Sequence, residues 1–159
     1  MNQVMISADS TCDLPVDLQR QRHVYCFALS ILLGDTAYAD GVEIRPADIY
    51  ADVAENHRLP KTAAVSPEEF KSFFAPILAE GYDIVHIDIS AELSCTCQNA
   101  VLAAQELTER GEIHVVDSRQ LSTGGGLLAL QGGHGAIGVA EALQQGLLVQ
   151  LQIRISRGR

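Results

Sequence analysis

Residues 83–94 read Asp-Ile-Val-His-Ile-Asp-Ile-Ser-Ala-Glu-Leu-Ser, and this stretch decides the fold class. Its first part, residues 83–89, is rich in β-forming side chains and predicts a strand. The polar turn from Ser90 to Ser94 leads into a predicted helix, and we expect Ser90 to cap it. The helix is expected to bury Leu93, Cys97, Ala100, Val101 and Ala104. A strand followed through a polar turn by a helix is typical of α/β proteins.

The same alternation recurs along the chain. Strands are predicted at residues 4–8, 24–33 and 113–116, and helices after Pro15, Pro46 and Pro67. Ser10 or Thr11 is expected to cap the first helix, and Gly34-Asp35 predicts a hairpin-like excursion. The other connections are too long for hairpins, so we expect a three-layer, Rossmann-like α/β domain: a mostly parallel sheet with helices on both faces.

Composition restricts the possible partners. The 159 residues, 47% of them hydrophobic, fit one domain, and the net charge is −9, with 20 acidic against 11 basic residues. This charge repels a phosphate backbone and an anionic membrane surface, so nucleic acid is not an expected partner. The first nine residues have no basic region and only a short apolar run, so we expect neither a signal peptide nor a membrane span. The sequence thus predicts a cytoplasmic protein.

Hydroxyl side chains follow several predicted strands or precede helices. They are Ser10, Thr11, Thr62, Ser66, Ser90, Ser94, Thr96, Ser118 and Ser122. Taken singly, each is explained as a helix cap. Because ligands collect at the carboxyl ends of parallel strands, the set also predicts an uncharged cradle of hydroxyl and N–H groups for a carboxylate or phosphate.

Other chemistries find little support. Cys95-Thr-Cys97 lacks the further paired ligands of a zinc site, so the four cysteines are interpreted as buried thiols and no metal is predicted. Residues 133–138 match G-x-G-x-x-G but follow no strand and precede no suitable acidic residue, so no cofactor is predicted. Ser94 could form a triad with Asp117 and either His86 or His114, but no serine lies in a nucleophile elbow.

Four blocks in order carry a family resemblance. They are Ile6-Ser-Ala-Asp-Ser-Thr-Cys-Asp-Leu14, Pro60-Lys-Thr-Ala-Ala-Val-Ser66, Ile87-Asp-Ile-Ser-Ala-Glu-Leu-Ser-Cys-Thr96 and Val115-Val-Asp-Ser118. Together they resemble the D-S-x-x-D, T-S-Q-P-S, S-S-x-L-S-G-T and D-S blocks of the DegV family. The similarity covers residues 3–130, and the combination is specific although each block alone is weak.

The resemblance implies a protein that binds a long-chain fatty acid and is not an enzyme. By analogy, Thr62 and Ser94 would hydrogen-bond the carboxylate, while the acyl chain runs through an apolar channel toward a second domain. Such a protein acts as an acyl carrier that presents the carboxylate to a separate fatty acid kinase. The predicted ligand-binding residues are Thr62, Ser94, Ser10, Ser66, Thr96 and Ser118.

This sequence departs from the family pattern in three places. Cys95 replaces a preferred glycine, residues 63–65 replace the S-Q-P core, and the chain stops at Arg159. We therefore expect a lipid-binding domain at 1–130, an atypical tail at 131–159 and a missing second domain, through truncation or a shifted reading frame. Without that cover, Phe27, Leu29 and Ile31 are expected to form an exposed apolar floor.

Two alternatives remain open on the sequence alone. One is a small serine hydrolase or phosphate-ester transferase with Ser94 as its nucleophile. The other is a truncated, non-functional remnant that folds poorly.

Overall fold

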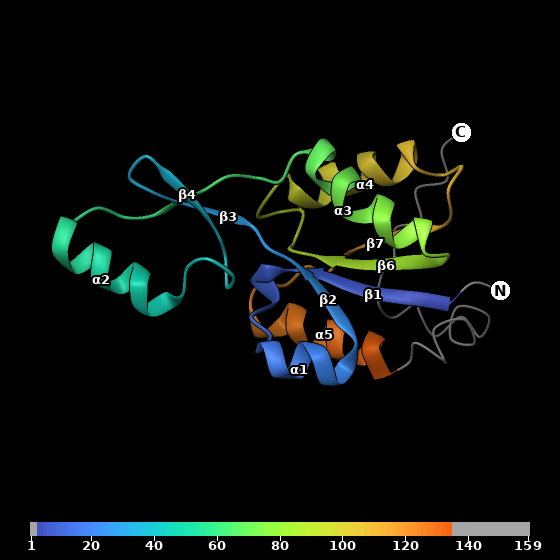
Figure 1. Ribbon diagram of the computed structural model, residues 1–159, viewed down its shortest axis with the longest axis horizontal. Coiled ribbons are helices and arrows are strands. Elements are labelled where there is room, and N and C mark those ends of the chain that lie inside the picture. The colour runs from blue at the N-terminus through green and yellow to red at the C-terminus, as the bar shows by residue number, and fades with distance from the viewer. Residues whose placement is uncertain (1–2, 135–159) are drawn as a thin grey trace.

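A computed structural model of the chain describes residues 3–134, which form two sheets (Figure 1). The larger sheet is parallel, with strand order β2-β1-β6-β7. Its strands are β1 (Gln3–Asp9), β2 (Val24–Phe27), β6 (Tyr82–Asp88) and β7 (Ile113–Asp117). The smaller sheet is antiparallel, with order β4-β3-β5. It contains β3 (Ser30–Leu33), β4 (Thr36–Ala39) and β5 (Lys61–Thr62).

Helices cover both faces of the parallel sheet. On one face lie α3 (Pro67–Ala79) and α4 (Thr96–Glu106), and on the other lie α1 (Val16–Arg22) and α5 (Thr123–His134), as Figure 1 shows. A short 3₁₀ turn, η1 (Ser10–Cys12), joins β1 to α1. The predicted three-layer α/β fold is therefore confirmed.

The parallel sheet separates two hydrophobic cores. Side chains alternate across β6, so Ile84 packs into the core under α3 and α4, whereas Val85 packs into the core under α5. All four phenylalanines of the chain lie on the first side, where Phe70 stacks between Phe27 and Phe74 at ring-centroid distances of 5.3 and 5.5 Å. This burial explains the apolar face predicted after Pro67.

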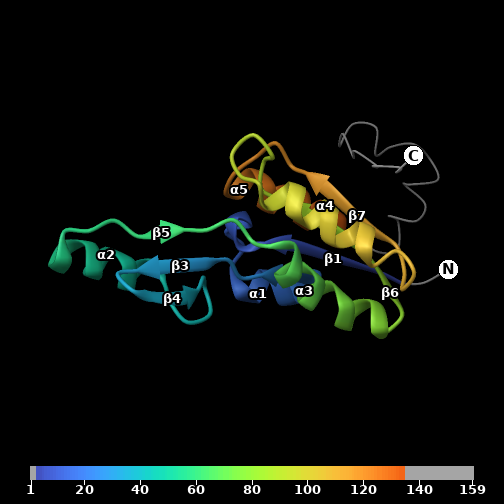
Figure 2. The same ribbon diagram turned by 90° about the horizontal axis from the view of Figure 1, so that it is seen from above.

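The smaller sheet and α2 (Pro46–Asn56) extend away from the three-layer body in both views (Figures 1 and 2). A small core of Ile31, Leu33 and Ile44 holds this extension together. The hairpin expected at Gly34-Asp35 is present as β3 and β4.

The predicted strand at 24–33 is two strands in different sheets. β2 ends at Phe27, the chain turns, and β3 begins at Ser30. Leu29 is fixed at the turn because its N–H donates to Ser10 Oγ (3.2 Å) and its carbonyl accepts from Asp40 N–H (2.8 Å). The continuous apolar run concealed this change, since both strands are partly buried.

The predicted start of α4 and the predicted cap are both wrong. The helix begins at Thr96, and Leu93 is 61% exposed instead of buried. Ser90 accepts the N–H of Glu92 in a turn before the helix, whereas Ser94 Oγ accepts the N–H of Thr96 at 3.2 Å. Ser94, and not Ser90, therefore provides the hydroxyl that accepts a hydrogen bond from the start of α4.

The predicted cap of the first helix, Ser10 or Thr11, is also wrong. The 3₁₀ turn η1 before that helix is capped by Asp9, whose carboxylate accepts Thr11 N–H at 2.8 Å. Helix α1 follows Pro15 without a side-chain cap. A carboxylate can cap as well as a hydroxyl, and here it comes from the last residue of the strand.

The expected apolar floor is not exposed at the predicted residues. Leu29 and Ile31 are buried, and Phe27 is half-buried against Phe70 and Phe73. Packing against α3 and the small sheet accounts for this burial. Of the predicted tail at 131–159, residues 131–134 complete α5, and the remainder lies outside the described residues.

Candidate functional site

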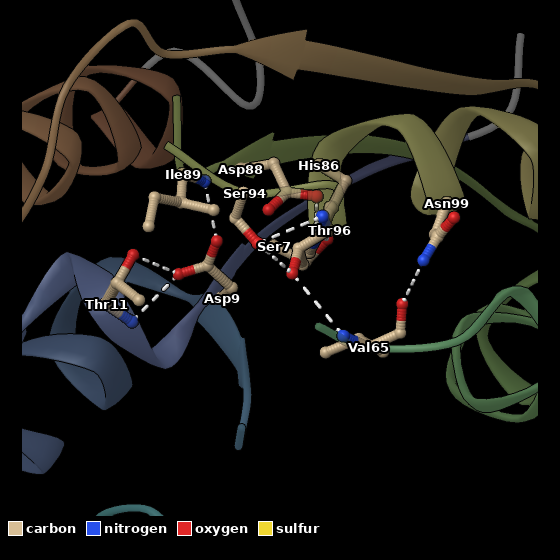
Figure 3. A network of polar contacts seen from close by, with 10 residues as sticks. All are labelled: Ser7, Asp9, Thr11, Val65, His86, Asp88, Ile89, Ser94, Thr96 and Asn99. Atoms are coloured by element: carbon tan, nitrogen blue, oxygen red, sulfur yellow. Dashed lines mark hydrogen bonds and ion pairs between the residues drawn. The ribbon is translucent and has the colours of Figure 1, made fainter. Parts of the chain in front are cut away.

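The candidate site lies at the carboxyl edge of the parallel sheet. Because β1, β6 and β7 are neighbours in one parallel sheet, the segments that follow them meet at this edge. These segments are η1, the turn at residues 89–95 and the turn at residues 118–122. Figure 3 shows the polar side chains that the first two segments and the strand ends bring together.

Ser94 and Thr96 form the hydroxyl pair at the start of α4. Their hydroxyl oxygens lie 2.8 Å apart, and Thr96 is fully buried whereas Ser94 is half-buried. Thr96 Oγ1 also accepts Val65 N–H at 3.4 Å. Thr96 therefore positions its neighbours, and Ser94 is the more accessible hydroxyl beside the N–H groups of the first helical turn.

Thr62 is connected to this pair only through the chain segment that carries it. It lies exposed on β5, paired with Ile31 of β3. Both backbone groups of Val65, three residues later, contact α4. Its N–H donates to Thr96 Oγ1, and its carbonyl accepts from Asn99 Nδ2 at 2.7 Å (Figure 3). The segment that bears Thr62 is thus anchored at the start of the helix that follows Ser94.

The other predicted hydroxyls have partners elsewhere in the protein. Ser10 donates to Asp40 Oδ2 at 2.7 Å, and Ser118 accepts the N–H of Gln120 at 3.1 Å. Ser66 caps α3 in a capping box with Glu69, and these hydrogen bonds lower the pKa of the Glu69 carboxyl group. A ligand-binding role for these three hydroxyls is supported by none of these contacts.

A buried ionisable cluster was not predicted from the sequence. Asp9 accepts hydrogen bonds from Thr11 and from Ile89 N–H (2.6 Å), which ties η1 to the end of β6. Asp88, at the end of β6, is fully buried, and neither of its side-chain oxygens has a hydrogen-bond partner among the described residues. Burial, together with the negative charge of Asp9, raises the pKa of Asp88 to about 10.

His86 lies behind this edge and has a structural environment. Its Nδ1 is 2.8 Å from Ser7 Oγ, and its ring packs edge-on against Phe70 and Phe74. Burial lowers the pKa of His86 to about 4. The periodic apolar pattern of residues 83–89 could reveal that this strand is central, but not that it buries two ionisable groups.

The geometry gives Ser94 no catalytic base among the described residues. Its hydroxyl partner is Thr96, whereas His86 contacts Ser7, and His114 lies beside Glu112 at 3.3 Å. Asp117 instead accepts the backbone N–H groups of Ala91 and Arg119. This arrangement speaks against the triad considered for a hydrolase.

A hollow of about 180 Å³ opens beside the site, toward α5. Its lining combines polar and apolar groups: Asp9, Thr11, Cys12, Ile87, Asp88, Ile89, Ser118, Gln120, Leu121 and Gly125. Across residues 3–134, no group of three or more histidine, cysteine or acidic side chains is arranged to hold a metal ion. None of the helices in that range is both long and apolar enough to cross a membrane.

The cysteines differ from the prediction of buried thiols. Cys12 and Cys97 are buried and Cys26 is half-buried, whereas Cys95 is exposed in the turn before α4. All four are free thiols. The exposure of Cys95 follows from the late start of the helix, which leaves residues 91–95 on the surface.

Fold and site together define a class: a three-layer α/β domain with a hydroxyl-lined polar site at the carboxyl edge of its parallel sheet. Residues 3–145 match the model of the DegV family, which is described as a family of uncharacterised proteins. The chain belongs to the DegV family.

Curated relatives agree with this membership. A DegV domain-containing protein of Clostridium perfringens is 36% identical over 131 residues, which cover 82% of this chain and 47% of that protein. A relative from Mycobacterium tuberculosis is 35% identical over 135 residues, which cover 84% of this chain and 45% of that protein. The chain thus spans about half the length of the curated relatives it matches.

Solved structures of fatty-acid-binding proteins share the fold. A fatty-acid-binding DegV family protein from Thermus thermophilus matches with a TM-score of 0.78 and 34% identity, covering 96% of this chain and 52% of that one. A stearic acid-binding protein from Eubacterium ventriosum matches with a TM-score of 0.80 and 27% identity, covering 89% of this chain and 51% of that one. DegV of Bacillus subtilis supports the fold alone. It is 19% identical and has a TM-score of 0.85, and the match covers 96% of this chain and 53% of that one.

Proposed function

We propose that this chain binds a long-chain fatty acid through its carboxylate, with Thr62 and Ser94 as hydrogen-bond donors. It acts as an acyl carrier that presents the carboxylate to a separate fatty acid kinase. We assign binding to residues 1–130. We assign the covering of the acyl chain to the half of the relatives' length that this chain does not match.

The main structural support is the anchorage of Val65 to α4. Its N–H donates to Thr96 Oγ1, which in turn lies 2.8 Å from Ser94 Oγ. Three residues of extended chain span at most about 10–11 Å, so Thr62 lies within that distance of Val65 along the chain. Two hydroxyls from different segments are thereby tied to one helix start.

The chemistry of this position suits an anion. The first turn of α4 has N–H groups without helical partners, and the partial positive charge of a helix N-terminus favours a carboxylate. Ser94 can donate its hydroxyl hydrogen while its oxygen still accepts Thr96 N–H at 3.2 Å. A hydrogen bond to a charged carboxylate contributes about 1.5–3 kcal/mol.

Replacement of the family's glycine by Cys95 does not distort this turn. Cys95 has φ −71° and ψ −5°, a right-handed conformation that any residue can adopt. Its side chain is exposed. The departure from the family pattern is therefore compatible with carboxylate binding.

Two observations support the proposed carrier role: the groups that the site contains and the ligands that related proteins bind. Ser94 is half-buried and Thr62 is exposed, so a carboxylate held between them would face a second protein. Among the described residues, Ser94 has a hydroxyl partner and no base, which suits a protein that leaves the phosphoryl transfer to another enzyme. Related structures from Thermus thermophilus and Eubacterium ventriosum are of fatty-acid-binding proteins.

Native mass spectrometry of the full chain after expression tests the binding step. We expect a complex whose extra mass, after denaturing extraction, corresponds to a long-chain fatty acid. Thr62→Val, which keeps the β-branched shape but removes the hydroxyl, should reduce occupancy, and Thr62→Ser should retain it. A folded chain that stays empty after incubation with stearate would refute the proposal.

The carrier step needs a separate experiment. The loaded chain is incubated with ATP alone and with ATP plus a fatty acid kinase, and acyl phosphate is trapped with hydroxylamine. We expect acyl phosphate only when the kinase is present. Product formation with ATP alone would instead indicate an enzyme.

A further inference from the structure

Cys12 and Cys26 lie in contact at one side of the parallel sheet. Cys12 ends η1, Cys26 lies in β2, and their sulfur atoms are 3.6 Å apart. Parallel pairing between β1 and β2 places Ala8 opposite Cys26, so the sheet itself holds the second cysteine beside the turn that carries the first. We propose that Cys12 and Cys26 form a reversible disulfide, which makes this pair a site of oxidation by small-molecule disulfides such as oxidised glutathione.

The required movement is small and falls on adaptable backbone. Sulfur atoms in a disulfide are about 2.0 Å apart, so the two thiols must approach by about 1.6 Å. Cys12 lies at the end of a three-residue 3₁₀ turn, and Cys26 lies in β2, which is an edge strand among the described residues. Neither residue belongs to the central β1–β6 pairing.

The buried member of the pair borders a hollow of the surface. Cys12 itself is only 4% exposed, but it lines the hollow of about 180 Å³ beside α5. Thr11 and Leu121 also line that hollow, and Leu121 is 55% exposed. Cys26 is half-buried on the neighbouring strand. Cys12 therefore borders the hollow, and Cys26 is the more exposed thiol of the pair.

The trapping variants described below test the order of the two steps, with Cys12 as the first nucleophile. A hydrogen bond from the Cys26 thiol lowers the pKa of Cys12, although burial opposes this effect. The same hydrogen bond, together with burial, raises the pKa of Cys26. Since the thiolate is the nucleophile, Cys12 attacks first and Cys26 resolves the product.

The exchange balances with the oxidant named. The Cys12 thiolate attacks one sulfur of oxidised glutathione, a mixed disulfide forms, and one glutathione thiolate leaves. Cys26 then loses its proton and attacks the Cys12 sulfur, the protein disulfide forms, and the second glutathione thiolate leaves. Two protein thiols are oxidised, one glutathione disulfide is reduced, and two protons are released overall.

The test uses the full chain carrying Cys95→Ser and Cys97→Ser, so that only the proposed pair remains. After incubation with oxidised glutathione, intact mass should fall by two hydrogen atoms, and peptide mapping should join residues 12 and 26. Adding Cys26→Ser should trap one glutathione on Cys12, and adding Cys12→Ser should prevent the mass loss. Thiols that stay free, or stable glutathione adducts on both cysteines, would overturn the proposal.

A denatured control separates a prearranged pair from chance encounter. The folded chain should reach half oxidation at a ratio of oxidised to reduced glutathione about tenfold lower than the chain in guanidinium chloride, because the fold raises the effective concentration of the two thiols. Equal ratios would contradict prearrangement. Should the cysteine variant fail to fold by circular dichroism, mapping of the unsubstituted chain decides: a 12–26 link supports the proposal, and a 95–97 link in its place contradicts it.

Discussion

His86 Nε2 lies 3.7 Å from Asp88 Oδ2 on the central strand β6, but the two groups do not form an ion pair. Both side chains are fully buried. Burial lowers the pKa of His86 to about 4 and raises the pKa of Asp88 to about 10, so both are neutral at pH 7. The separation also exceeds hydrogen-bonding distance. The stability of the fold should therefore depend on pH through both residues.

Replacing Asp88 by asparagine should stabilise the fold increasingly as the pH rises. The carboxyl group of Asp88 has a pKa of 3.8 as an ordinary aspartic acid, which applies to the unfolded chain, and a pKa of about 10 in the fold. Between these values the folded chain retains a proton that the unfolded chain has lost. The resulting stability is present below the unfolded pKa and is lost as the pH rises toward the folded value. Asparagine cannot ionise and avoids this loss.

We expect Asp88→Asn to gain on the order of 1–3 kcal/mol over the unsubstituted chain between about pH 5 and pH 8. Urea denaturation at several pH values measures this difference. A difference that stays constant across the range would show that Asp88 does not carry the pH dependence.

His86 should account for part of the loss of folding stability at acidic pH. Its pKa is 6.5 as a reference and about 4 in the fold, so its contribution to stability is present above the unfolded value and is lost as the pH falls through the folded value. His86→Gln should reduce the loss of stability between about pH 6.5 and pH 4 by on the order of 1–2 kcal/mol. Urea denaturation of both chains across this pH range measures the difference.

Two adjacent glycines of α5 should respond oppositely to alanine. A Cβ at Gly126 would lie 2.5 Å from the carbonyl oxygen of Cys12 and 3.1 Å from Leu14, so the helix or η1 must move. We expect Gly126→Ala to cost about 1–3 kcal/mol. A Cβ at Gly125 meets nothing within 4 Å, and Gly125→Ala should be neutral or gain up to about 1 kcal/mol through helix propensity. Midpoints of urea unfolding for the two variants should diverge; equal midpoints would disprove the close packing.

The sequence could predict the layers because they depend on local patterns. The apolar run at 83–89 and the Ser66-Pro67 helix start are both present where expected. The break between β2 and β3 was missed because Leu29 is fixed by Ser10 and Asp40, which are distant in sequence. Long-range hydrogen bonds leave no periodic signal.

The candidate site was only partly predictable for the same reason. Hydroxyl residues at strand ends are visible in the sequence, but their hydrogen-bond partners are not. The role of Thr96 depends on Val65, and the burial of Asp88 depends on the packing of two helical layers. Whether Thr62 and Ser94 share a ligand stays a prediction.

Ser94→Ala should weaken fatty-acid binding and should also lower the stability of the fold. The two losses have different causes and are measured separately. Loss of a hydrogen bond to the carboxylate should cost about 1.5–3 kcal/mol of binding free energy, or roughly tenfold to hundredfold in affinity. Stability should fall by about 0.5–1 kcal/mol, because Ser94 Oγ also accepts Thr96 N–H at the start of α4. Calorimetry with stearate and thermal melting by circular dichroism measure the two effects on the same preparation.

Ser66→Ala provides the matched control, since Ser66 caps α3 and both its donor and its acceptor capacity are used by Glu69. This variant should lose a similar amount of stability while its affinity for stearate stays unchanged. The comparison removes the effect of general destabilisation from the binding measurement. If both variants lose stability equally and neither loses affinity, Ser94 is a helix cap only, and the carboxylate is bound elsewhere.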